Sequence, residues 1–127
     1  MNGAHTIEFD PQGIIELTLW GELTTDWVPK LIHEVRPVVQ KYHCFRVLIN
    51  LQEVEFKLSV VDLYNLPDLI AKLTGASGVS ISAFKRALVL KQTDSLFHFF
   101  ETTAINRGHR VRMFQDVEAA RKWLLDH

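Results

Sequence analysis

The sequence predicts an α/β fold with four helices and a five-stranded, mostly parallel sheet. Strand-like and helix-like apolar patterns alternate along the chain in the order β β α β α β α β α. Two of the strands are near-continuous apolar runs, which is typical of strands covered on both faces. The 127 residues have the length of about one domain, and no long linker divides them. We therefore expect a single domain over residues 1–127.

An antiparallel hairpin is expected at the beginning of the chain. Thr6–Phe9 alternates weakly and Ile14–Trp20 alternates clearly between apolar and polar residues, so both are predicted strands. The turn Asp10–Gly13 joins them, because proline fixes φ and glycine accepts a positive φ. Such a short link makes the first strand an antiparallel edge. Gly21 is expected to end the second strand.

A long amphipathic helix should follow, capped by Thr25 or Asp26. Pro29 lies in its first turn, where it is tolerated, whereas Pro37 predicts a kink. One buried stripe accounts for the apolar positions, which are Trp27, Val28, Leu31, Ile32, Val35, Val38, Val39 and Tyr42.

Phe45–Leu51 is a nearly uninterrupted apolar run and predicts a central strand. Because this run is apolar on both faces, a shifted helix, the hairpin or another subunit must cover the second face. Ser59 and Asp62 have the spacing of a capping box, with Asp in place of Glu, and predict the start of a second helix. Pro67 predicts a break or bend there, with Asn65 able to cap the second half.

The last third of the chain repeats the strand–helix pattern twice. Arg86–Leu90 is a predicted fourth strand, and Thr93 or Asp94 is expected to cap a third helix that Gly108 ends. The last strand is expected at Val111–Phe114. Asp116 then caps a final helix whose inward residues are Val117, Ala120, Trp123 and Leu124. Strands joined through helices run parallel with right-handed crossovers.

Composition narrows the functional classes. With 47 % hydrophobic and 23 % charged residues, the chain is not disordered, and a net charge of −1 provides no basic field for nucleic acid. No apolar run is long enough to span a membrane, and the first residues lack a signal pattern, so we expect a cytoplasmic protein. The lone Cys44 excludes an internal disulfide, and the six histidines lack metal-ligand spacing, so no metal site is expected.

Polar residues gather where the parallel strands are expected to end. In open α/β sheets, ligands bind beyond the carboxyl ends of the strands. This edge is a candidate regulatory or partner rim, although helix capping also explains Ser59; its residues are Gln52, Glu53, Ser59, Lys91, Gln92 and Thr93. Because the sequence shows no nucleophile–base pair, paired acids or metal set, we expect no enzymatic activity and no cofactor.

The third predicted helix is unusually aromatic. Phe97 and Phe100 share one stripe, while Phe99 lies about 100° away around the helix. All three residues fit the core. Alternatively, they line the cavity of a small apolar ligand or form a contact in a homodimer.

Three segments resemble one known family. They are Gly21-Glu22-Leu23-Thr24-Thr25 before a helix, Arg86–Leu90 before an aromatic helix, and the closing Val111–Leu124 pattern V-R-M-F-Q-D-V-E-A-A-R-K-W-L. Together they resemble the SpoIIAA-like branch of the STAS domains, also labelled STAS/SEC14-like, over nearly the whole chain. The resemblance implies a SpoIIAA-like β–α superhelix and a cytoplasmic bacterial protein.

The resemblance also implies a role. The best-known relatives are anti-sigma factor antagonists that bind a kinase-like protein and are switched by serine phosphorylation at the start of the second helix. Ser59 matches that serine by position, while Leu58–Asp62 departs from the Asp-Ser-Ser-Gly phosphosite of the family. The first hypothesis is therefore a non-catalytic regulatory module with a protein partner, which is a kinase-like protein or a second copy. The alternative, from the SEC14 likeness, is a small apolar, lipid-like ligand.

Overall fold

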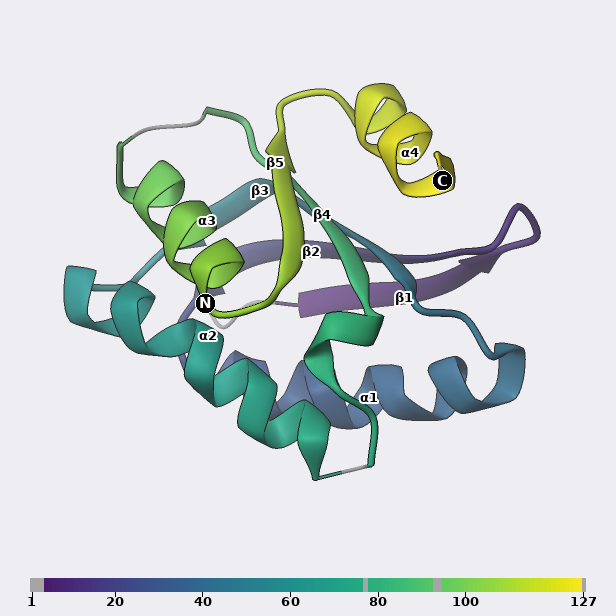
Figure 1. Cartoon of the computed structure of the whole chain (residues 1–127). Coiled ribbons are helices and arrows are strands. Elements are labelled where there is room, and N and C mark those ends of the chain that lie inside the picture. The colour runs from purple at the N-terminus through teal and green to yellow at the C-terminus, as the bar shows by residue number, and fades with distance from the viewer. Residues whose placement is uncertain (1–3, 77, 93–94, 127) are drawn as a thin grey trace.

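The strands form one sheet in sequence order. The computed structural model describes residues 4–76, 78–92 and 95–126. Antiparallel pairing joins β1 (Ala4–Asp10) to β2 (Ile14–Leu23), and parallel neighbours follow as β3 (Arg46–Phe56), β4 (Lys85–Val89) and β5 (Arg110–Phe114). The predicted mostly parallel sheet with an antiparallel first edge strand is confirmed (Figure 1).

The four helices divide unequally between the two faces of the sheet. One face carries α1 (Trp27–Tyr42), α2 (Val60–Gly75) and α3 (Ser95–Asn106), and α4 (Val117–Leu125) lies on the other (Figure 1). The larger core fills the side of the first three helices and includes Leu17, Val47, Leu63, Leu90 and Phe100. A short 3₁₀ turn, Ile81–Ala83, leads from α2 into β4.

A helix of the same chain covers the second face. Ala120 and Leu124 of α4 are fully buried, and they belong to one cluster with Leu48 and Ala87 of the sheet. A helix, the hairpin and another subunit were the three alternatives for covering this face, and the structure shows that a helix covers it. This face needs no second subunit.

The helix caps follow the sequence with one exception. Ser59 Oγ accepts a hydrogen bond from Asp62 N at 3.1 Å, and Asp62 Oδ2 accepts from Ser59 N at 2.9 Å, so the predicted capping box is confirmed. Asp116 caps α4 through the amide of Ala119, as predicted. Asp26 precedes α1 as expected, but its side chain makes no capping hydrogen bond. The predicted cap by Thr93 or Asp94 lies outside the described residues.

Of the predicted break or bend at Pro67, the break is wrong. α2 continues through this residue, and Asn65 does not start a second helix. Leu63 before the proline and Pro67 itself are buried against the core. Tertiary packing therefore outweighs the single backbone hydrogen bond that proline removes.

β2 and β3 are both longer than predicted. Gly21 does not end β2 but lies within it at a φ of +88°. Gln52 and Glu53 lie inside β3, not after it. A bulge explains the extension, because Thr18 pairs with Asn50 and Trp20 with Glu53, so β3 advances one residue more than β2. The side chain of Asn50 accepts from Gln52 N there, at 3.1 Å.

Candidate functional site

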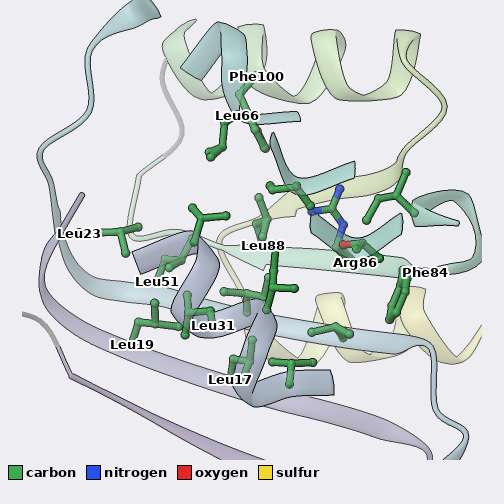
Figure 2. A pocket seen from close by; sticks show the side chains of 18 of the residues that line it. Leu17, Leu19, Leu23, Leu31, Leu51, Leu66, Phe84, Arg86, Leu88 and Phe100 are labelled. Atoms are coloured by element: carbon green, nitrogen blue, oxygen red, sulfur yellow. The ribbon is translucent and has the colours of Figure 1, made fainter. Parts of the chain in front are cut away.

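A largely apolar cavity of about 210 Å³ lies between the sheet and the first three helices (Figure 2). Its size exceeds the ~150 Å³ of an engineered cavity that binds benzene. Leucines from the strands form its floor, and apolar residues of the helices form its walls; the lining includes Leu17, Leu19, Leu51, Leu88, Leu31, Leu66 and Phe100.

The cavity exists because α1 does not pack closely on the strands. Val39 is the buried residue of this helix, Tyr42 is exposed, and the rest of its apolar stripe is half-buried. Val28, Leu31 and Val35 of that stripe line the cavity. The stripe that predicted a core helix therefore borders empty space along much of its length.

One charged side chain lies deep in this apolar wall. Arg86 is 7 % exposed and stands between Val47 and Val111 of the neighbouring strands, both buried. Its guanidinium lies among the side chains that line the cavity (Figure 2). Burial lowers the pKa of Arg86 to about 10, so the group is still a cation at neutral pH.

The contacts of Arg86 leave its charge uncompensated. Nη2 lies 2.5 Å from Nδ1 of His109, and Nε is buried with no hydrogen-bond partner in the described part of the chain. Burial, assisted by the charge of Arg86, lowers the pKa of His109 to about 4. His109 is therefore neutral at pH 7, and Nδ1 accepts the proton of Arg86, which assigns the ring proton to Nε2.

Sequence reasoning missed Arg86 as a site residue, although a signal was available. Arg86 and Leu88 alternate along β4, and Leu90 follows directly after the strand, so all three are expected on the same face of the sheet. When both faces of a strand are covered, an arginine in that strand is buried whichever face its side chain lies on. Buried arginines are rare and are usually paired with an acidic residue, so one without such a neighbour is a candidate binding residue.

The three phenylalanines of α3 separate into two environments. The ring of Phe97 meets that of Phe56 edge-on at 4.7 Å, Phe100 is 4 % exposed, and both line the cavity. Phe99 is 40 % exposed and stacks on Tyr64 of α2, with ring centroids 6.3 Å apart. Phe99 does not line the cavity.

An exposed apolar patch surrounds the start of α2. Val60, Val61 and Tyr64 are 54 %, 66 % and 50 % exposed. Together with Ser59 and Phe99 they form what we call the Ser59 surface. Exposed large apolar residues in a group are typical of binding sites, whereas scattered ones are not.

The aromatic centre of the Ser59 surface is held in place. Arg107 Nη1 donates to the backbone oxygen of Tyr64 at 3.0 Å and pairs with Asp68 at 3.1 Å. Its guanidinium carbon also lies 4.6 Å from the centroid of the Tyr64 ring. Tyr64 thus contacts both Arg107 and Phe99 before any partner binds.

The other predicted rim residues are only partly brought together. Gln52 Nε2 donates to the backbone oxygen of Gln115 at 3.1 Å, which joins the interior of β3 to the residue after β5. Glu53, Lys91 and Gln92 are exposed. Thr93 lies outside the described residues.

Within residues 4–76, 78–92 and 95–126, no group of three His, Cys, Asp or Glu side chains could hold a metal ion. Cys44 is buried, and its Sγ donates to the backbone oxygen of Gly13 at 3.2 Å. None of the described helices has the length and apolarity to cross a membrane.

Solved structures with the same architecture cover almost the whole chain. An anti-sigma factor antagonist from Mycobacterium paratuberculosis matches with a TM-score of 0.62 and 17 % identity, over 98 % of this chain and 96 % of that one. The anti-sigma factor antagonist SpoIIAA in its unphosphorylated form matches with a TM-score of 0.57 and 13 % identity, over 94 % and 97 %. The chain has the SpoIIAA-like fold.

A third match carries the same fold without an assigned role. It is an uncharacterised protein of the DUF3478 family from Shewanella loihica, with a TM-score of 0.52 and 20 % identity, over 96 % of this chain and 93 % of that one. No protein-family model and no curated protein matches the sequence. At these identities the comparisons establish the SpoIIAA-like fold of the chain, in which Ser59 begins α2.

Proposed function

We propose that residues 1–127 act as one non-catalytic regulatory domain in the cytoplasm, and that the Ser59 surface binds a protein partner. The observation that carries this proposal is the exposure of Val60, Val61, Tyr64 and Phe99 beside Ser59. Aromatic residues that are already ordered lose little freedom on binding and often dominate the energy of an interface. Tyr64, held by Arg107 and Phe99, fits that description.

The class of partner follows from the fold and from the position of Ser59. Similar structures include those of anti-sigma factor antagonists, and the phosphorylated form of SpoIIAA matches this chain with a TM-score of 0.53. A regulatory, kinase-like protein is therefore the proposed partner. A phosphate on Ser59 would place negative charge beside the Asp62 carboxylate, which accepts from Ser59 N, and within an apolar surface.

A matched pair of variants tests this surface. Val61→Asp places a charge at its most exposed apolar residue, and Ile105→Asp places the same charge on another exposed apolar residue, which lies on α3 outside the surface. In pull-downs from the native host, we expect Val61→Asp to lose a partner that the wild type and Ile105→Asp both retain. Identical sets of bound proteins would contradict the proposal. Gel filtration shows whether the lost partner is a second copy of the chain.

The cavity favours a second candidate function, the binding of a small apolar ligand. About 210 Å³ of space lined mainly by leucine and phenylalanine is unusual in a close-packed core. Native mass spectrometry of the purified full chain tests this function. A bound small molecule that disappears on denaturation is expected, and its absence together with no binding of added apolar probes would contradict it.

A further inference from the structure

We propose that the cavity binds a medium-chain carboxylate, with the apolar tail against the leucines and the carboxylate paired with Arg86. This inference rests on the second candidate function, that the cavity is a binding site, and adds the chemical class of the ligand. Its basis is that the wall of an apolar cavity contains a buried guanidinium that forms no ion pair within the described part of the chain.

The first argument concerns charge. A buried cation is costly unless a counter-ion or several hydrogen bonds compensate it. In the described part of the chain, Arg86 forms no ion pair, and its hydrogen bond is to a neutral histidine. An anionic ligand would compensate the charge that the described residues leave without an ion pair.

The second argument concerns geometry. Arginine binds carboxylates through parallel hydrogen bonds from its planar fork. His109 occupies Nη2 of Arg86, and Nε remains without an acceptor although it is buried. Protein atoms cover Nε in this structure. A carboxylate oxygen would therefore reach this donor once the side chains that cover it shift.

The third argument concerns the rest of the lining. Arg36 also borders the cavity, but it is half-buried and donates to the backbone oxygen of Leu73 at 3.3 Å. Arg86 is therefore the buried cation at this site. One positive charge matches a monovalent carboxylate better than a phosphate monoester, which carries nearly two negative charges at neutral pH.

The size of the cavity sets the length of the tail. About 210 Å³ is less than the ~300–1,000 Å³ typical of sites for drug-sized ligands, but more than benzene needs. Octanoate is a suitable probe, and octan-1-ol is the neutral control with the same tail.

Titration calorimetry of the full chain at neutral pH tests the inference without any variant. We expect octanoate to bind at least about tenfold more tightly than octan-1-ol, because hydrogen bonds to charged groups have that effect. Equal affinities would overturn the role of Arg86 and leave an apolar binding site. Binding of neither probe would overturn both the inference and the candidate function on which it rests. Tighter binding of octyl phosphate than of octanoate would overturn the assignment of the ligand as a carboxylate.

Two variants then test which arginine is responsible for the preference for octanoate over octan-1-ol. Arg86→Gln is expected to lower the affinity for octanoate to that for octan-1-ol, while Arg36→Gln should leave it within about twofold. Loss of octanoate preference in Arg36→Gln alone would contradict the assignment to Arg86. If Arg86→Gln does not fold, the carboxyl carbon of ¹³C-labelled octanoate is placed by NMR in the wild type; proximity to the Arg86 side chain is expected, and proximity to Arg36 would overturn the proposal.

Discussion

Arg86 Nη2 donates to Nδ1 of His109 across 2.5 Å, which joins β4 to the residue just before β5 at the wall of the cavity. Both side chains are buried, with 7 % and 4 % of their surfaces exposed. The pair therefore places a cation and a neutral imidazole in a largely apolar environment.

The first prediction concerns the pH dependence of His109. Burial, together with the charge of Arg86, lowers the pKa of His109 from 6.5 to about 4 in the folded state. Between these two values the unfolded chain binds a proton that the folded chain does not. The free energy of unfolding should therefore fall as the pH decreases from 6.5 to about 4, by an amount on the order of 2 kcal/mol after allowance for solvent screening.

Urea unfolding at several pH values measures this loss, and NMR titration of the imidazole measures the pKa directly. His109→Gln keeps an acceptor facing Arg86 without titrating, so its loss of stability across the same window should be smaller. A folded-state pKa near 6.5 for His109 would contradict the prediction.

The second prediction concerns Ser59. Ser59→Ala should lower the free energy of unfolding by about 1 kcal/mol, because the hydrogen bond with Asp62 is lost. Ser59→Asp should cost little, since aspartate is an equally good N-cap. Urea denaturation measures both. Equal losses in the two variants would mean that capping does not explain the stability contributed by this residue.

The third prediction separates the phenylalanines of α3. Phe100→Ala should lower the free energy of unfolding by about 3–5 kcal/mol because Phe100 is buried, and Phe99→Ala by less than about 1 kcal/mol because Phe99 is 40 % exposed. Thermal unfolding of both variants measures the difference. A larger loss in Phe99→Ala than in Phe100→Ala would contradict the described orientation of α3.

The fourth prediction concerns the space beside α1. Leu31→Phe adds volume to the lining of the cavity and should raise the free energy of unfolding by about 0.5–1 kcal/mol while weakening octanoate binding. Val60→Phe, on the exposed face of α2, should change neither quantity. A loss of stability of more than about 1 kcal/mol in Leu31→Phe, measured by urea unfolding, would show that the space is not available.

The succession of helices and strands could be predicted because it depends on local patterns, and the parallel direction followed from the helices that join the strands. The alternation in Ile14–Trp20 and the capping box at Ser59 report on single elements, and the structure confirms both. Gly21 and Pro67 were misinterpreted because tertiary pairing outweighed local preference. Gly21 lies inside a strand because β2 pairs with β3 over a longer stretch than the local pattern predicts. α2 continues past Pro67 because the helix packs on the core.

The candidate site was less predictable for the same reason. The periodicity of α1 predicts an apolar stripe but not its distance from the sheet, and the cavity depends on that distance. The sequence likewise does not show that Tyr64 meets Phe99, since these residues lie on different helices. The burial of Arg86 could have been predicted, because it lies on the same face of a buried strand as Leu88.

Hydrogen–deuterium exchange of the full chain with its captured partner tests the central claim, that the Ser59 surface is the binding face, most directly. Amides of residues 59–64 in α2 and of 97–100 in α3 should gain protection when the partner is added. Protection confined to α4 and β5, with residues 59–64 unchanged, would contradict it.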